Sequence, residues 1–210
     1  GRRRDGACEV GDAALSVAQW LASMQRRPLH AINVVEPHDM AAVAAGVPAL
    51  PEPYRAEERA AIAELLEARM ARTRWGRGTT QRVDVVDGPA VRTVTDLARE
   101  RAAHAIVVGT GQHGAFGRLV YGERAVQIAR LADRPVVVVP PGTAAGPVSD
   151  AIVAVDFSPA SQRAARFAIE MLADEGRLTL VHVKSALKLS EESAGWWDDA
   201  YERRAADLFR

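Results

Sequence analysis

Two short runs of apolar, mostly β-branched residues constrain the fold of this chain more than any other feature of its sequence. Residues 105–108 and Val136–Val139 are uninterrupted apolar stretches that end at Gly109 and Pro140. Runs of this kind are typical of strands buried on both faces of a parallel sheet. Helical patterns alternate with strand patterns around them. The alternation predicts an α/β fold with a parallel sheet and helices on both faces.

The remaining elements follow from apolar periodicity and from Gly and Pro punctuation. We expect Asp12 to cap the first helix and Gly88-Pro89 to open a later one. Helices are predicted over 13–24, 54–74, 160–172 and 190–210. Two more are predicted between them, one that starts at Pro89 and one that follows the glycine-rich loop and ends near 131. Strands are predicted over 29–35, 81–86, 105–108, 136–139, 151–155 and 178–183.

The chain contains an internal repeat of about one domain length. Residues 13–34 and 160–183 each contain a helix, a charged turn and a short apolar strand, and 29–34 parallels 178–183. We therefore predict a first domain over 1–142, a linker over 143–150 and the amino-terminal part of a second domain over 151–210. The first copy has no counterpart of the strand at 151–155. Truncation, residues missing from this sequence and a strand supplied by one copy to the other all remain open as explanations.

Charge and cysteine content exclude several classes of protein. The 27 basic and 27 acidic residues give a net charge of zero, which argues against a nucleic-acid-binding domain. A hydrophobic content of 48% is incompatible with a disordered chain. One cysteine precludes an internal disulfide, and no apolar run reaches the ~18 residues of a membrane span. These features predict a cytoplasmic protein without a membrane partner.

A glycine-rich segment after the strand at 105–108 is the strongest candidate for a ligand site. Glycines there let backbone N–H groups approach a phosphate at a helix start, although a tight surface loop also requires them. Gly109, Gly111 and Gly114 match the dinucleotide pattern Gly-x-Gly-x-x-Gly, but they follow a late strand and not the first one. No Gly-Lys-Ser/Thr follows, which excludes a P-loop NTPase.

Four motifs in order resemble the universal stress protein family. They are a strand ending in Asp-Phe-Ser-Pro (153–159), a Leu-Val-His-Val strand (180–183), Gly-Pro-Ala opening a helix (88–90), and a strand, glycine-rich loop, helix and Val-rich strand (106–139). The resemblance extends over nearly the whole chain in two copies. It implies an open five-stranded parallel sheet with helices on both faces, in tandem with a partial second copy.

The resemblance also implies where a nucleotide would bind. ATP-binding members carry Gly-x2-Gly-x9-Gly-Ser/Thr, which falls here on Gly109, Gln112, Gly122 and Glu123. A side chain at Gln112 obstructs close backbone approach, and the Glu123 carboxylate would repel a triphosphate. Glu123 is also interpretable as a helix-start carboxylate. These departures predict weak or no ATP binding by the first copy.

Further residues match family positions near the base and ribose. They are Val34 in the first copy and Asp156 and Val183 in the second. Asp156 is equally interpretable as a cap of the helix that starts at Pro159. ATP or AMP is the candidate ligand, and no cofactor is assigned with certainty.

Three functions remain open at this point. The leading hypothesis is a nucleotide-related stress-response module that is not an enzyme, since no nucleophile–base pair or metal cluster occurs at suitable spacing. An ATP-binding member with slow or no hydrolysis and a dimerisation module without ligand are the alternatives. Because an apolar edge strand needs a partner, and family members pair there, we expect Val136–Val139 to associate with another domain or subunit.

Overall fold

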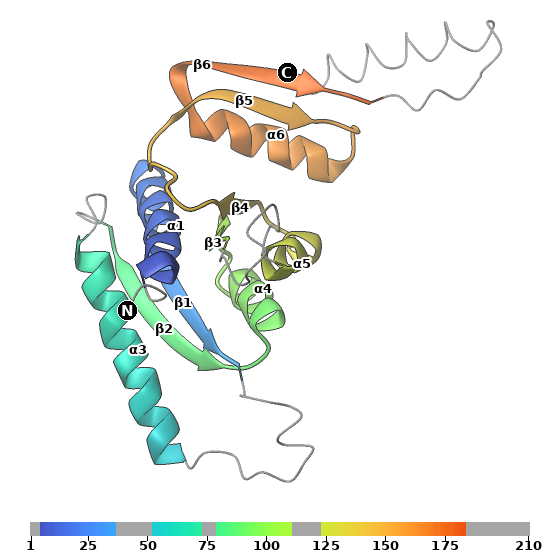
Figure 1. The fold of residues 1–210 in the computed structure, drawn as a ribbon. Coiled ribbons are helices and arrows are strands. Elements are labelled where there is room, and N and C mark those ends of the chain that lie inside the picture. Colours follow the sequence, from blue (N-terminus) through green and yellow to red (C-terminus); the bar gives the residue numbers. More distant parts are fainter. Residues whose placement is uncertain (1–4, 37–51, 73–78, 111–122, 184–210) are drawn as a thin grey trace, which may run out of the picture. The chain divides into compact units, whose positions relative to one another are not determined.

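The computed structural model describes residues 5–36, 52–72, 79–110 and 123–183 (Figure 1). The chain forms two compact units, Gly1–Gly146 and Pro147–Arg210. The elements of the first unit are α1 (Asp5–Met24), β1 (Leu29–Val35), α3 (Glu52–Arg72), β2 (Gln81–Asp87), α4 (Ala90–Glu100), β3 (Ile106–Gly109), α5 (Glu123–Leu131) and β4 (Val136–Val139). Those of the second unit are β5 (Val148–Ala154), α6 (Pro159–Met171) and β6 (Leu172–Val181).

The described strands form three parallel pairs, each made of two strands that follow one another along the chain. β1 pairs with β2, β3 with β4 and β5 with β6, and a helix connects the two strands of each pair. The prediction of an α/β fold with parallel strands is therefore confirmed. The prediction of one continuous five-stranded sheet is wrong for the described residues, because no hydrogen-bonded ladder joins β1 to β3 and unit 1 contains two separate pairs.

Several element boundaries differ from those predicted. Helix α1 begins at Asp5, so Asp12 lies inside the helix and does not cap it. Strand β5 begins at Val148, inside the segment predicted as linker, and β6 begins at Leu172 instead of 178. Val148 pairs with Leu172 beyond a register irregularity, which extends both strands toward their amino ends. The helix predicted over 190–210 lies outside the described residues.

The core of unit 1 is built by helices packed against short strands. Ala13 and Val17 of α1 form a buried cluster with Val139 of β4, whose side chain is 2% exposed. A second buried cluster contains Ala98 of α4, Ile106 of β3 and Ile128 of α5. Helix α1 therefore covers one side of the β3–β4 pair, and the α4–α5 layer packs against Ile106.

A buried glutamine connects three elements of unit 1. Gln19 of α1 is fully buried, and its Nε2 donates to the Met70 carbonyl of α3 at 3.1 Å and to Gln81 Oε1 of β2 at 2.8 Å. Its own Oε1 has no hydrogen-bond partner. Because buried amides are costly unless paired, these two bonds fix the position of α1 over the β1–β2 pair.

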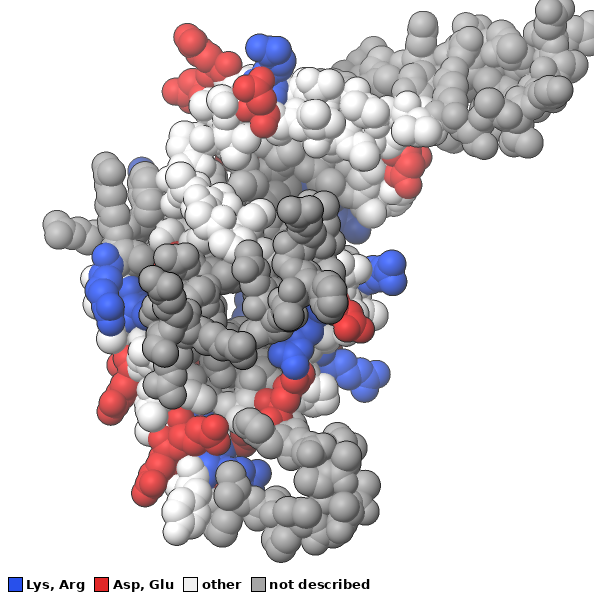
Figure 2. All heavy atoms as spheres, viewed as in Figure 1, with Lys and Arg blue, Asp and Glu red and all other residues white. Residues whose placement is uncertain are grey.

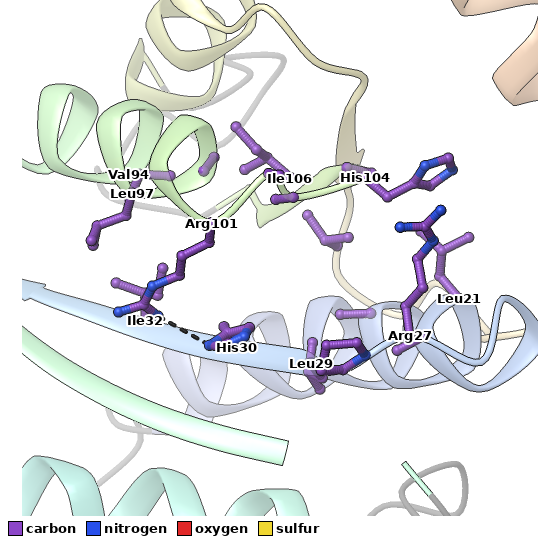
Figure 3. Close-up of a pocket in the computed structure, with 18 of the residues that line it drawn as sticks. Leu21, Arg27, Leu29, His30, Ile32, Val94, Leu97, Arg101, His104 and Ile106 are labelled. Atoms are coloured by element: carbon purple, nitrogen blue, oxygen red, sulfur yellow. Dashed lines mark hydrogen bonds between the residues drawn. The ribbon is translucent and has the colours of Figure 1, made fainter. Parts of the chain in front are cut away.

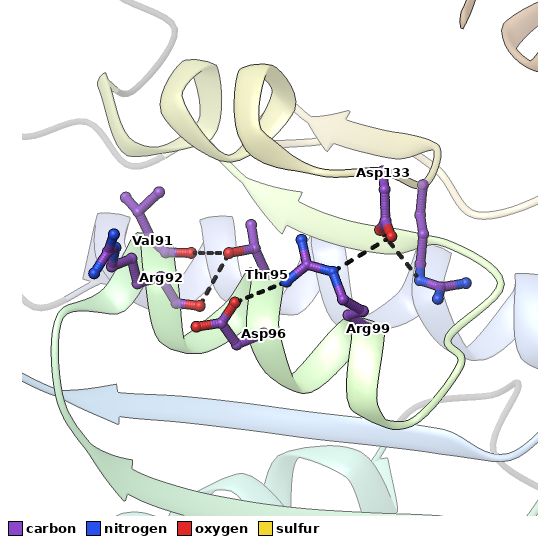
Figure 4. A network of polar contacts seen from close by, with 7 residues as sticks. Val91, Arg92, Thr95, Asp96, Arg99 and Asp133 are labelled. Carbon is purple, nitrogen blue, oxygen red and sulfur yellow. Dashed lines mark hydrogen bonds and ion pairs between the residues drawn. The ribbon is translucent and has the colours of Figure 1, made fainter. Parts of the chain in front are cut away.

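Polar contacts along α4 orient that helix (Figure 4). The buried Thr95 hydroxyl donates to the carbonyls of Val91 and Arg92 at 3.0 and 2.9 Å. Arg99 pairs with Asp96 one turn earlier at 3.0 Å and with Asp133 before β4 at 3.5 Å. The second pair connects the end of α4 to the segment that enters β4.

The described part of unit 2, up to residue 183, is a strand–helix–strand arrangement. Val153 and Val155 pack with Ala165 of α6 in a buried cluster, whereas the Ile152 side chain is 76% exposed. Alternate residues of a strand face opposite sides. Helix α6 therefore covers one face of β5, and Ile152 lies on the other.

Charged side chains of both signs are interspersed on the face drawn in Figure 2. This distribution agrees with the net charge of zero. No helix in the described part of the chain is long and apolar enough to cross a membrane.

Candidate functional site

The carboxyl end of β1 lies next to the starts of helices α4 and α5. Glu36 follows β1 directly and forms hydrogen bonds with Ala90, the first residue of α4, and with Arg124, the second residue of α5. Ligands of parallel α/β folds bind at the carboxyl ends of strands, where helix starts supply N–H donors. This edge of unit 1 is therefore the candidate site.

The carboxylate of Glu36 takes the place that an anionic ligand would need. One of its oxygens accepts from the Ala90 N–H at 3.1 Å, and the other accepts from the Arg124 guanidinium. The residue before the helix, Pro89, forms no side-chain cap. Glu36 thus neutralises both the positive end of the α4 dipole and a nearby cation.

The turn from β2 into α4 requires glycine. Gly88 has φ 148°, and its N–H donates to the Val35 carbonyl at 3.1 Å. A Cβ atom at this position would lie 2.7 Å from Thr93 Oγ1. The predicted helix start at Gly88-Pro89 is confirmed, and the turn places Ala90 within reach of Glu36.

The described candidate site residues of unit 1 lie at or near the ends of their elements. Val34 is half-buried in β1 and pairs with Val86. Gly109 ends β3 opposite Val139, and the Glu123 carboxylate at the start of α5 is exposed and accepts from Gln127 Nε2 at 3.2 Å. Gly111, Gln112 and Gly122 lie outside the described residues.

Asp156 in unit 2 forms the capping arrangement of α6. Its Oδ1 accepts from the Ser158 N–H at 2.9 Å, and Ser158 Oγ in turn accepts from the Ser161 N–H at 3.2 Å. Hydrogen bonds, first from the Ser158 side chain and then from its backbone, lower the pKa of Asp156 to about 2. The carboxylate is thus ionised at neutral pH and directed toward the helix start.

Val183 and its neighbour lie just beyond β6. Val183 is 84% exposed. His182 Nδ1 lies 2.6 Å from the Val155 carbonyl, and its ring is 5.2 Å from that of Phe157. Asp156 and His182 are therefore close to the same turn, while Val34, Gly109 and Glu123 belong to the other unit.

Glu36 is a site residue that the sequence patterns did not predict. The one local feature that could have identified Glu36 is its position directly after an apolar strand. Asp156 follows Val155 in the same way. Its partners are 54 and 88 positions away, so the pattern around Glu36 does not reveal them. The described residues contain no group of three or more His, Cys, Asp or Glu side chains arranged to hold a metal ion.

Comparison with known sequences connects this geometry to a family. The sequence profile of the universal stress protein family (Usp) matches residues 6–140 and 149–208. The chain belongs to the universal stress protein family. The first of the two matched segments contains Glu36 and the loop after β3, and the second contains Asp156.

Several solved structures are similar to this chain at low sequence identity. Hypothetical protein MJ0577 is 12% identical over 65% of this chain and 91% of its own, with a TM-score of 0.52. UspA from Lactobacillus plantarum is 19% identical, with a TM-score of 0.49 over 62% of this chain and 90% of its own. A universal stress protein described in complex with cAMP is 20% identical over 64% and 90%, with a TM-score of 0.43. No curated protein matches the chain.

Proposed function

We propose that this universal stress protein is a non-enzymatic, nucleotide-related regulatory module whose first domain binds ATP weakly or not at all. The tandem arrangement of a first domain and a partial second one is part of this proposal. The observation that carries it is Glu36, because its carboxylate occupies both the start of α4 and the Arg124 guanidinium. A phosphate would have to displace that carboxylate to reach either group.

A second carboxylate supports the same conclusion. Glu123 is the first residue of α5. ATP-binding members of the family carry Ser or Thr at this position. Glu123 therefore adds negative charge next to Arg124 in the sequence. Charges near a helix start act directly on an anion bound there. The two acids together disfavour a triphosphate more than a ligand with fewer negative charges. AMP or a cyclic nucleotide is accordingly a better candidate than ATP.

Thermal unfolding in the presence of nucleotides tests the proposal. The unmodified protein and the variants Glu123→Ser, Glu36→Gln and the double variant are compared with ATP, ADP, AMP and cAMP. A ligand that binds the folded state raises Tm in proportion to RT ln(1 + [L]/Kd). We expect ATP to stabilise the double variant and to leave the unmodified protein almost unchanged.

Glu64→Gln, on the exposed surface of α3, controls for the loss of one negative charge. Equal stabilisation of the unmodified protein and the double variant by ATP would contradict the proposal.

A dimerisation role is the second candidate, favoured by β4. Val136–Val139 pairs only with β3 among the described strands, which leaves its other backbone edge without a strand. An apolar edge strand favours pairing with another chain. Analytical ultracentrifugation of the unmodified protein and Val138→Pro measures this directly, and a concentration-independent monomer in the unmodified protein would exclude it.

A further inference from the structure

Helix α3 packs against the β1–β2 pair with one face and leaves its opposite face exposed (Figure 1). Met70 on the inner face is buried, whereas Tyr54 and Leu65 on the outer face are 63% and 51% exposed. Tyr54 and Leu65 are separated by about three helical turns, so they lie on the same face. Large apolar side chains that gather on one exposed face mark an interaction surface, whereas single ones do not.

The outer face of α3 has the spacing of a helix-pairing surface. Six of its exposed residues recur at alternating steps of four and three positions, and they are Tyr54, Glu58, Ala61, Leu65, Ala68 and Arg72. We call these six residues the outer stripe. Steps of this kind define the a and d positions of a heptad repeat, along which a second helix packs. Four of the six side chains are apolar, and the two charged ones are of opposite sign.

The outer stripe is complementary to itself when two copies run antiparallel. In one register Tyr54 faces Arg72, Glu58 faces Ala68 and Ala61 faces Leu65 of the other copy, and each contact occurs twice. Small side chains then lie opposite larger ones, as close packing requires, and the Tyr54 ring lies opposite a cation. In the parallel arrangement Glu58 would face Glu58 and Arg72 would face Arg72, which like-charge repulsion disfavours. The stripe therefore fits an antiparallel second copy better than a parallel one.

The charges along α3 fit the same register. Three of its arginines pair with acids of the same chain, Arg55 with Glu52 at 2.8 Å, Arg59 with Asp87 at 2.7 Å and Arg69 with Asp12 at 3.8 Å. Arg72 forms no ion pair with an acid in the described part of the chain, and its Nε donates to the Ala68 carbonyl one turn back at 3.2 Å. Figure 2 shows basic side chains at the upper end of α3 and acidic ones below them. In the antiparallel pair Arg72 lies about one helical turn from the level of Glu58 of the other copy, within reach of its long side chain.

The outer stripe is separate from the cavity of unit 1. That cavity, of about 330 Å³, is lined mainly by α1, β1, α4 and β3 (Figure 3), and α3 contributes no residue to it. The stripe also lies on a different element from the β4 edge and from Glu36. Pairing through the stripe can therefore be measured separately from association through β4 and from ligand binding.

We propose that the outer stripe of α3 is a docking surface for the outer stripe of a second copy of this chain, with the two helices antiparallel. The paired stretch, 54–72, is about 27 Å long. One helix against another buries an area at the small end of protein–protein interfaces, below about 1,200 Å². Glu57 and Glu64 lie beside the stripe and place like charge on both copies, which lowers the affinity further. The pair is therefore weak and reversible, and its population rises with protein concentration.

Sedimentation of the full chain over a series of protein concentrations tests the proposal. We expect the unmodified protein to associate, and Leu65→Glu to associate about tenfold more weakly, because it places a carboxylate at the centre of the stripe. Leu131→Glu is the matched control, since Leu131 is a leucine of α5 with a similar exposed fraction, 57%. Association through β4 would be the same in both variants as in the unmodified protein.

Charge reversal tests the register of the pair. Glu58→Arg and Arg72→Glu should each weaken association about tenfold, because each brings like charges together in the antiparallel arrangement. The double variant brings opposite charges together again and should recover most of the lost affinity. A substitution that merely disturbs α3 would not be rescued by a second one.

Disulfide cross-linking tests the direction of the two helices. Ala61→Cys and Leu65→Cys are prepared as separate variants, each with Cys8→Ser, which removes the one native cysteine. In the antiparallel register positions 61 and 65 of different copies face each other, within reach of a disulfide. A mixture of the two variants should therefore give more cross-linked dimer than either variant alone.

Four results would overturn the proposal. They are an unmodified protein that stays monomeric at every concentration, association that Leu65→Glu leaves unchanged, a double charge reversal that recovers no affinity, and cross-linking that is no greater in the mixture than in the single variants. Nucleotide binding at the carboxyl ends of the strands enters none of these readouts, so they are independent of the proposed function.

Discussion

The carboxylate of Glu36 accepts a hydrogen bond from the guanidinium of Arg124, 88 positions further along the chain. The pair joins the end of β1 to the start of α5. Its other oxygen receives the Ala90 N–H at the start of α4. One side chain therefore occupies two groups that an anion at this edge would use.

Removing the Glu36 charge should make Arg124 available to phosphate. We expect Glu36→Gln to bind pyrophosphate about tenfold more tightly than the unmodified protein, because a neutral amide no longer competes for the guanidinium. Isothermal titration calorimetry at two salt concentrations measures the gain. In the double variant Glu36→Gln/Arg124→Gln the gain should disappear, and its persistence would show that Arg124 is not the group released.

Gly88→Ala should destabilise unit 1 more than Gly142→Ala. Both glycines have positive φ, 148° and 76°, but only at Gly88 would a Cβ meet another atom, Thr93 Oγ1 at 2.7 Å. Backbone strain costs roughly 1–3 kcal/mol at such positions, and the contact adds to it at Gly88 alone. Urea denaturation followed by circular dichroism compares the two variants, and equal losses would argue against a tight turn before α4.

Gln19→Met should lower the free energy of unfolding by about 1–3 kcal/mol. The substitution keeps the side-chain length and removes the bonds to the Met70 carbonyl and to Gln81 Oε1. Chemical denaturation measures the loss, with Glu67→Ala on the exposed face of α3 as the control. A variant as stable as the unmodified protein would mean that these bonds do not hold α1 in place.

The ionisation of Asp156 should couple the stability of unit 2 to pH. Its folded-state pKa of about 2 lies below the usual 3.8. The contribution is therefore complete above about pH 4 and is lost as pH falls from there through 2. Carboxyl chemical shifts in an NMR titration report this pKa directly. Ser158→Ala should raise it, because the Ser158 side chain is the largest cause of the shift, and an unchanged value would assign the shift to another group.

Local patterns predicted most of the elements, because each depends on neighbouring residues. The strand at 29–35 and the helix opened by Gly88-Pro89 both follow from apolar periodicity and Pro chemistry. The start of β6 at Leu172 was not predictable in this way, since the charged residues after Leu172 have the pattern of a turn. They belong to the strand because β6 pairs with β5.

The residues of the candidate site also differ in whether local sequence could predict them. Glu123 and Asp156 were predictable as residues at element ends, and the structure places both at helix starts. Glu36 was not, because its role depends on a backbone N–H and a guanidinium contributed by two other helices. Whether any of these residues contacts a nucleotide stays a prediction that the titrations above address.

The arrangement of the described strands in three consecutive pairs has a kinetic consequence. In the described part of the chain a helix lies between the two strands of each pair, so the contacts of a pair stay within one strand–helix–strand stretch. Low sequence separation reduces the entropy lost before native contacts form and favours rapid acquisition of structure. The three modules are thus expected to form early and independently, with the burial of Gln19 and the Glu36–Arg124 contact as the later, slower steps that consolidate unit 1.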